Sequence, residues 1–314
     1  MSLDPSPDPL TTTPDDHIMP DSERRGVIGA LPCSVRPYAS LIRLDRPIGA
    51  WLLYWPGAWS VVLAGPRGGE WWLLLWFALG AWAMRSAGCV YNDILDRDLD
   101  AKVERTRLRP LASGRASLGG AWALLVAMSL IGLVVLLRLD RTAQIVALAS
   151  LAPVAAYPFM KRITWWPQAW LGLVFSWAAL VGWPAVTGRI ELPALLLYAG
   201  SIFWVIGYDT IYALQDKEDD ALVGVKSSAL ALGAKAPLGI GICYALALAL
   251  WCASIWTVRP EGPAIIALGP LALHLLWQVA TLRQEEGADA LAKFRSNRFA
   301  GLLMFLACLV VGNS

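Results

Sequence analysis

Two acidic segments, each at the end of a long apolar run, carry the residues of this sequence that could do chemistry. The first, YNDILDRDLD, covers residues 91–100, and the second, YDTIYALQDKEDD, covers residues 208–220. If the first segment continues as a helix, Asn92, Asp96 and Asp100 fall within about 80° of one another. Such a face gathers like charges, which repel and oppose the helix dipole unless something positive lies among them. A hard divalent cation is the natural candidate.

The second acidic segment repeats this pattern. On a helix, Asp209, Asp216 and Asp220 fall within about 40° of one another. The pairs Asp96/Asp100 and Asp216/Asp220 lie 120 residues apart, which predicts a parallel internal duplication with two acidic faces opposed across one cavity. Carboxylate and amide oxygens without His or Cys suit Mg²⁺, which takes substrate phosphates as further ligands. We therefore expect a diphosphate substrate held by metal. The predicted metal ligands are Asn92, Asp96, Asp100, Asp216 and Asp220.

Basic residues follow both acidic segments. Arg105 and Arg109 share a face if their segment is helical, and a guanidinium group suits phosphate oxygens. Lys226 follows the second segment. These three residues are expected to neutralise a departing diphosphate.

Arg85 lies inside an apolar run, seven residues before Asn92. Seven residues are nearly two helical turns, so Arg85 is predicted to point to the same cavity, one step deeper. A buried arginine needs an anion. That anion is either a substrate carboxylate or an internal partner, of which Asp209 is the best candidate.

The elements that must position these residues are membrane helices. The chain is 57% hydrophobic and 16% charged, whereas soluble domains are about 25% charged. This predicts an all-α integral membrane protein, and the small net charge of +2 does not indicate a nucleic-acid partner. Runs of about 20 apolar residues mark candidate spans. The nine predicted spans cover residues 47–64, 71–91, 118–138, 142–158, 165–185, 190–213, 236–257, 263–282 and 298–312.

Charge asymmetry predicts the orientation of the chain. The loops after even-numbered spans carry about three times as many Lys and Arg residues as those after odd-numbered spans, and cytoplasmic loops carry this excess. We therefore expect a multi-pass protein of a bacterial inner membrane, with the N-terminus and both acidic segments cytoplasmic and the C-terminus on the far side. Residues 1–36, rich in Pro, Asp, Ser and Thr, are predicted to be a disordered leader rather than a transit peptide. Residues 37–314 would form the membrane domain.

The two acidic motifs resemble the NDxxDxxxD and DxxxD signatures of the UbiA superfamily of intramembrane prenyltransferases. Four further stretches resemble its 4-hydroxybenzoate polyprenyltransferase branch in particular. They are RLDRPIGAWLLYWPGAW (43–59), VERTRLRPLASG (103–114), YPFMKRIT (157–164) and YDTIYALQDKEDDALVGVKSSA (208–229).

The resemblance implies nine transmembrane helices around a central cavity. It implies transfer of a polyprenyl group from polyprenyl diphosphate to the ring carbon ortho to the hydroxyl of 4-hydroxybenzoate, in ubiquinone biosynthesis. The products would be 3-polyprenyl-4-hydroxybenzoate and diphosphate. Two Mg²⁺ ions would bridge the diphosphate, with the lipid bilayer as surroundings and no obligate protein partner.

The resemblance also implies roles for individual residues. Arg46 and Lys161 lie in matching motifs and would help to bind charged groups, while Arg85 would meet the acceptor carboxylate. Catalysis would depend on the four motif aspartates Asp96, Asp100, Asp216 and Asp220, and Asp209 could assist deprotonation of the phenol. Three tyrosines near the cytoplasmic ends could orient substrates or face a cation with their rings. They are Tyr157, Tyr208 and Tyr212.

The sequence is also compatible with two other functions. The first is prenyl transfer to another acceptor, such as homogentisate, a naphthoate or haem. The second is an ion-coupled transporter that uses the carboxylates as a relay. Transporter sites usually lie near the midplane of the bilayer, whereas these carboxylates are predicted at one interface, which disfavours the transporter.

Overall fold

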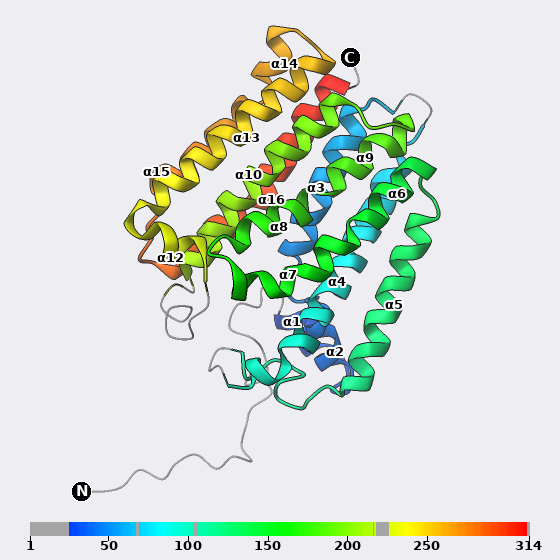
Figure 1. Ribbon diagram of the computed structural model, residues 1–314, viewed down its shortest axis with the longest axis vertical. Coiled ribbons are helices and arrows are strands. Elements are labelled where there is room, and N and C mark those ends of the chain that lie inside the picture. Colours follow the sequence, from blue (N-terminus) through cyan, green and yellow to red (C-terminus); the bar gives the residue numbers. More distant parts are fainter. Residues whose placement is uncertain (1–24, 67–68, 103–105, 216, 218–225, 313–314) are drawn as a thin grey trace, which may run out of the picture. The chain divides into compact units, whose positions relative to one another are not determined.

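The computed structural model describes residues 25–66, 69–102, 106–215, 217 and 226–312, and among these residues it contains helices and no strand. The predicted all-α class is therefore confirmed (Figure 1). The elements are α1 (Arg25–Gly29), α2 (Arg36–Leu41), α3 (Ile48–Leu63), α4 (Trp72–Asp100), α5 (Leu118–Leu136), α6 (Arg141–Ala149), α7 (Leu151–Ile163), α8 (Pro167–Ser176), α9 (Ala178–Thr187), α10 (Leu192–Gln215), α12 (Ser228–Leu232), the 3₁₀ helix η2 (Gly233–Lys235), α13 (Ala236–Val258), α14 (Gly262–Ile266), α15 (Gly269–Thr281) and α16 (Gly287–Gly312).

Within the described residues, 8 helical stretches are long and apolar enough to cross a membrane. Four of them are the single helices α4, α5, α10 and α16, and the others join shorter helices, such as α6 with α7 and α8 with α9. Helix α3 fills the first predicted span but has only 16 residues, a length of about 24 Å against a hydrocarbon core of about 30 Å. The count of nine spans therefore stays a prediction.

The chain divides into two compact units. Unit 1 comprises Met1–Pro47 and Ser86–Ala127, and unit 2 comprises Ile48–Arg85 and Met128–Ser314. The predicted cavity and internal repeat involve both units and residues outside the described ranges, so both stay predictions. The residues predicted as a leader include α1, while residues 1–24 lie outside the described part.

Unit 1 contains the polar end of α4. Its small apolar core gathers buried side chains from α2, α4, the segment before α5 and the first turn of α5. The side chain of Arg36 donates to the carbonyl oxygens of Leu31 (2.8 Å) and Gly29 (2.7 Å), which fixes the turn between α1 and α2. This core and turn hold the chain around residue 43 against the last three turns of α4.

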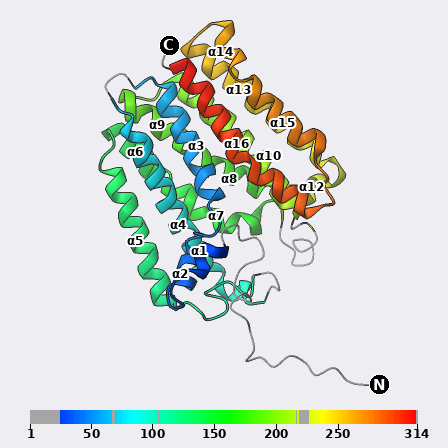
Figure 2. The same ribbon diagram turned by 180° about the vertical axis from the view of Figure 1, so that it is seen from behind.

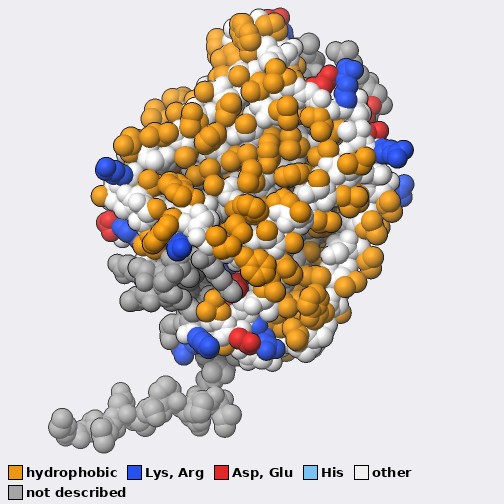
Figure 3. All heavy atoms as spheres, in the orientation of Figure 1, with side chains coloured by type: hydrophobic (Ala, Val, Ile, Leu, Met, Phe, Trp, Pro, Cys, Tyr) orange, Lys and Arg blue, Asp and Glu red, His pale blue; other side chains and the backbone are white. Residues whose placement is uncertain are grey.

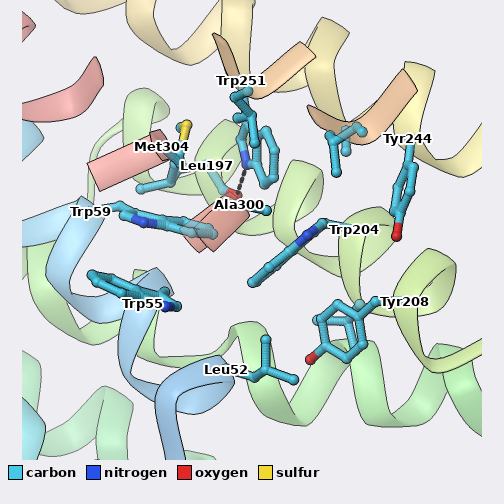
Figure 4. Close-up of a cluster of buried hydrophobic side chains, with 14 of the residues drawn as sticks. Leu52, Trp55, Trp59, Leu197, Trp204, Tyr208, Tyr244, Trp251, Ala300 and Met304 are labelled. Carbon is cyan, nitrogen blue, oxygen red and sulfur yellow. Dashed lines mark hydrogen bonds between the residues drawn. The ribbon is translucent and has the colours of Figure 1, made fainter. Parts of the chain in front are cut away.

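Unit 2 is a helical bundle in which α10 packs against α8, α13 and α16, and α3 packs against α9 and α16 (Figures 1 and 2). Aromatic rings fill its core: Trp59 lies 5.1 Å from Trp204 and 5.4 Å from Trp251, centroid to centroid (Figure 4). A Cβ atom at Gly301 of α16 would overlap the Trp55 indole of α3. Glycine at this position therefore permits the close packing of α3 on α16.

Hydrogen bonds inside this bundle also tie α10, α13, α15 and α16 together. The Trp204 indole donates to Asn297 Oδ1 (2.9 Å), and the Tyr244 hydroxyl donates to Gln278 Oε1 (2.7 Å). Asn297 and Gln278 are both fully buried. In an apolar surrounding, an unpaired polar group costs free energy, so these bonds specify how the helices pack.

Hydrophobic side chains spread across the face of unit 2 that carries α13 and α15 (Figure 3). Leu238 and Ile242 on α13 and Leu273 and Leu276 on α15 are all exposed. In water such a surface would be unfavourable, whereas in a bilayer it contacts lipid tails. The exposed faces thus fit the membrane assignment.

Candidate active site

Helix α4 remains helical as far as Asp100, so the predicted acidic face exists as a continuous surface. Asp100 is buried on this face, and Asn92 and Asp96 are half-buried. Asp98 points away, with a side chain 82% exposed that pairs with Arg97. Because water solvates Asp98 but not Asp100, only the inward face keeps carboxylates that need a positive partner.

Two arginines of unit 1 supply part of that positive charge. Arg109 donates from Nη1 to Asp100 Oδ2 (2.8 Å) and to Asp93 Oδ1 (3.3 Å). Arg43 donates from Nη2 to the same oxygen of Asp93 (2.8 Å). Asp93 is 1% exposed, and its Oδ2 atom has no hydrogen-bond partner among the described residues. The four side chains form a neutral ion-pair cluster at the end of α4.

Arg43 was missed as a site residue. It is a non-glycine residue with a positive φ of 56°, in the left-handed region that side chains rarely adopt. Burial by itself would lower the pKa of its guanidinium, but the Asp93 carboxylate raises it, and the pKa ends above its ordinary value. The charge of Arg43 is therefore fixed over the working pH range. The RLDRP stretch that contains it offered a signal, because two arginines flank an aspartate there.

Arg46, predicted to bind charged groups, lies in the same turn. Its Nε atom is 3.4 Å from Asp45 Oδ2, and Asp45 is buried. Sequence reasoning also missed Asp45. A buried aspartate beside Arg46 orients this guanidinium and reduces its net charge toward a ligand.

Part of the predicted site lies outside the described residues. This applies to Arg105, Asp216, Asp220 and the side chain of Lys161. Within the described ranges, no group of three or more His, Cys, Asp or Glu side chains is close enough to hold a metal. The α4 half of the predicted set still fits Mg²⁺ in its chemistry, because Asn92, Asp96 and Asp100 offer amide and carboxylate oxygens on one face of the helix.

Arg85 belongs to unit 2, where it is half-buried. Its guanidinium lies over the Phe175 ring, with Cζ 5.7 Å from the ring centroid. A Cβ atom at Gly49 would come within 2.5 Å of Arg85 Nε. Phe175 and Gly49 thus pack closely against this guanidinium.

The three predicted tyrosines and Asp209 also lie in unit 2. Tyr208 is buried and its ring centroid lies 4.9 Å from that of Trp204 (Figure 4). Tyr212 packs on Phe294 at 4.7 Å, and Tyr157 is partly buried against the same core. Asp209 is half-buried on α10. The hydroxyl oxygen of Tyr208 is buried and has no hydrogen-bond partner among the described residues.

Lys226, predicted to neutralise phosphate, contacts the segment after α7. Its Nζ atom donates to the Ile163 carbonyl oxygen (3.3 Å) and lies 5.7 Å from the Trp165 ring centroid. Lysine can leave such weak contacts for a phosphate at small cost, because its charge sits on a flexible stem.

Comparison with known proteins identifies relatives of the chain. The family profile described as "UbiA prenyltransferase family" matches residues 53–309. The protein named "4-hydroxybenzoate polyprenyltransferase, mitochondrial" from Drosophila melanogaster is 44% identical over 280 residues, which are 88% of this chain and 71% of that protein. The proteins of the same name from Rattus norvegicus and Arabidopsis thaliana are 44% and 42% identical, over 91% and 90% of this chain and 77% and 70% of their own lengths.

Solved structures of UbiA homologs share the fold of this chain. A UbiA homolog from Aeropyrum pernix K1, in its apo form, has a TM-score of 0.69 and 27% identity, covering 83% of this chain and 97% of its own. A UbiA homolog from Archaeoglobus fulgidus bound to GPP and Mg²⁺ has a TM-score of 0.65 and 17% identity, covering 88% of this chain and 99% of its own.

The expected bacterial inner membrane is wrong. The relatives named above are mitochondrial proteins of eukaryotes. The error has a physical reason, since an excess of Lys and Arg tells which loops share one side of a membrane but not which membrane it is.

The family match covers most of the chain, and the aspartate motif on α4 lies inside it, as the resemblance predicted. This chain therefore belongs to the UbiA prenyltransferase family.

Proposed function

We propose that this chain is a 4-hydroxybenzoate polyprenyltransferase. It transfers a polyprenyl group from polyprenyl diphosphate to the ring carbon ortho to the hydroxyl of 4-hydroxybenzoate, in ubiquinone biosynthesis. The observation that carries the proposal is the inward acidic face of α4, together with relatives of this name that are 42–44% identical over about nine-tenths of the chain. Their name also supports a mitochondrial membrane as its location.

In this proposal Asn92, Asp96 and Asp100 would hold Mg²⁺ together with Asp216 and Asp220. When bound, Mg²⁺ supplies positive charge that stabilises the departing diphosphate. The metal chemistry draws support from the Archaeoglobus fulgidus homolog, which was solved with GPP and Mg²⁺. Two ions are our expectation, because the ligand set consists of two motifs.

The basic residues have distinct tasks. Arg109, Arg105, Lys161 and Lys226 bind phosphate oxygens as the allylic C–O bond breaks, while Arg46 supports the same charge. In a site that excludes water such charges stabilise a departing anion far better than in solution. The prenyl carbon that loses diphosphate then becomes electron-poor.

Arg85 orients the acceptor through its carboxylate, which directs the phenol end of the ring toward the prenyl carbon. A new C–C bond forms at the carbon ortho to the hydroxyl, and that carbon then loses its proton. Asp209 is our candidate to assist loss of the phenol proton. Tyr208, Tyr212 and Tyr157 present ring faces and hydroxyls that position the substrates and stabilise positive charge.

An acceptor panel tests this function. Purified protein in nanodiscs receives Mg²⁺, one polyprenyl diphosphate and, in parallel, 4-hydroxybenzoate, homogentisate, a dihydroxynaphthoate or haem. We expect prenylation of 4-hydroxybenzoate at the highest kcat/KM. Preference for another acceptor would contradict the substrate assignment but not the reaction class.

A second series varies the donor chain length at saturating 4-hydroxybenzoate. We expect activity with several lengths, because a tunnel open to lipid constrains the far end of the chain weakly. Solute flux driven by an ion gradient in vesicles, without a prenyl donor, would instead support a transporter.

A further inference from the structure

Under the proposed function, on which this inference rests, Arg109 and the metal compete for the same carboxylate. The Nη1 atom of Arg109 lies 2.8 Å from Asp100 Oδ2, and Asp100 is a proposed Mg²⁺ ligand. A guanidinium on one carboxylate oxygen reduces the negative charge that a cation meets there. A divalent cation close by would also repel it. Arg109 therefore needs another anion when the metal binds.

Asp93 is placed to be that anion. Its Oδ1 atom already lies 3.3 Å from Arg109 Nη1. The carboxylate is 1% exposed, and its Oδ2 atom is buried without a donor among the described residues. A buried carboxylate oxygen without a donor is expensive. Any donor that moves onto it therefore gains more than it would at an exposed carboxylate.

Arg43 decides how strongly Asp93 attracts Arg109. It donates to the same Oδ1 atom at 2.8 Å, closer than Arg109 does. One carboxylate thus serves two guanidinium groups, and Arg109 makes its shorter contact with Asp100 instead. The three ion pairs share Asp93 and Arg109, so a change in one contact alters the strength of the other two.

We propose that Asp93 is a positioning residue that receives Arg109 when Asp100 turns to the metal. Before substrate binds, Arg109 bridges Asp93 and Asp100, and together with Arg43 it neutralises both carboxylates. With Asp100 engaged by the metal, Arg109 would pair with Asp93 alone and would remain available to bind the diphosphate. Asp93 thereby couples metal binding to the presentation of a phosphate-binding group, without touching the metal itself.

The test measures metal affinity rather than turnover. Mn²⁺ is titrated into each variant in nanodiscs and the free ion is followed by EPR, once without and once with inorganic diphosphate. Asp93→Asn removes the alternative carboxylate, so Arg109 stays on Asp100, and Mn²⁺ should bind about tenfold more weakly. Arg109→Gln frees Asp100, so Mn²⁺ alone should bind about fivefold more tightly, as expected for gaining or losing one partly buried ion pair.

A double variant distinguishes this positioning role from a general loss of local structure. In the double variant Asp93→Asn with Arg109→Gln, the affinity should return close to that of Arg109→Gln, because no guanidinium is left to relocate. Additive effects would mean that Asp93 supports only the local fold. Added diphosphate should reduce the difference in Mn²⁺ affinity between Arg109→Gln and the unmodified protein, because Arg109 then binds the diphosphate instead of Asp100.

Two further variants provide a control and an independent test. Arg97→Gln removes an arginine of α4 that pairs with exposed Asp98, and it should leave Mn²⁺ affinity within about twofold. Arg43→Gln keeps the charge of Asp93 but removes the competing guanidinium, so Arg109 can pair with Asp93 more strongly and release Asp100. Mn²⁺ should then bind about threefold more tightly. This variant tests the proposal even if Asp93→Asn fails to fold.

The outcomes distinguish the inference from the function on which it rests. Equal Mn²⁺ affinity in all these variants would overturn the role of Asp93 while leaving the proposed metal site intact. Absence of Mn²⁺ binding to the unmodified protein, with and without diphosphate, would instead overturn the metal site and thus part of the proposed function.

Discussion

Replacing Gly49 with alanine tests whether Arg85 binds the acceptor carboxylate. The new Cβ atom would lie 2.5 Å from Arg85 Nε and 3.2 Å from its Cζ atom, whereas ordinary contact starts at 3.4 Å. The guanidinium must therefore move by about 0.9 Å. The end of a flexible side chain moves rather than backbone, so we expect a functional change with little loss of stability.

The size of the effect follows from the contact that is disturbed. A hydrogen bond to a charged group contributes about 1.5–3 kcal/mol, and about 1.4 kcal/mol corresponds to a tenfold change. Complete loss in Arg85→Leu should raise the acceptor KM by about 10- to 100-fold. In Gly49→Ala the guanidinium is displaced but present, so we expect a rise of about fivefold. The donor KM should stay within about twofold in both variants.

Steady-state kinetics in nanodiscs measure both constants, with 4-hydroxybenzamide as a neutral acceptor. The preference for 4-hydroxybenzoate over the amide should fall in Gly49→Ala. Gly241→Ala in α13 is the matched control, since its Cβ atom would meet Val279 at an ordinary 3.6 Å. An unchanged acceptor preference in Arg85→Leu, or an equal rise of the donor KM, would refute the assignment.

Three other predictions concern the metal, Lys226 and the bundle. Removing divalent ions with EDTA should abolish transfer while the helical circular dichroism persists, and added Mg²⁺ should restore it; full activity in EDTA would contradict the metal assignment. Lys226→Met should raise the donor KM about threefold, as expected for the loss of one flexible charge contact. Lys235→Met, at an exposed position, should leave the donor KM unchanged. Equal kinetics of the two variants would show that Lys226 does not belong to the site. Asn297→Leu leaves the buried Trp204 indole without its acceptor and should destabilise the bundle by about 1–3 kcal/mol. Its thermal midpoint in detergent should fall, while exposed Thr281→Ala should leave it unchanged, and equal midpoints would show that the network is dispensable.

Local patterns were enough to predict eight of the nine proposed spans as helices long and apolar enough to cross a membrane, and to predict that α4 continues as a helix through its acidic segment. Helical periodicity places Asp98 on the side of the helix opposite Asp96 and Asp100, and in the structure Asp98 is exposed whereas Asp100 is buried. These features depend on spacing along one helix and on the apolar length that a bilayer requires. Both quantities can be read directly from the sequence.

Pairings between distant residues could not be predicted in the same way. Arg43 and Asp93 lie 50 residues apart, and Arg43 has a left-handed backbone conformation that residues other than glycine rarely adopt. The sequence predicted Arg109 as a phosphate ligand but not as the partner of Asp100. Likewise, Gly49 becomes important only because α3 and α4 bring it against Arg85.

The most direct measurement is the product formed from 4-hydroxybenzoate, a polyprenyl diphosphate and Mg²⁺ by purified protein in lipid, identified by mass spectrometry and NMR. We expect 3-polyprenyl-4-hydroxybenzoate from the unmodified protein and from Asp98→Asn, and its loss in Asp96→Asn. Unchanged turnover in Asp96→Asn, or no ring-prenylated product from the unmodified protein, would contradict the account.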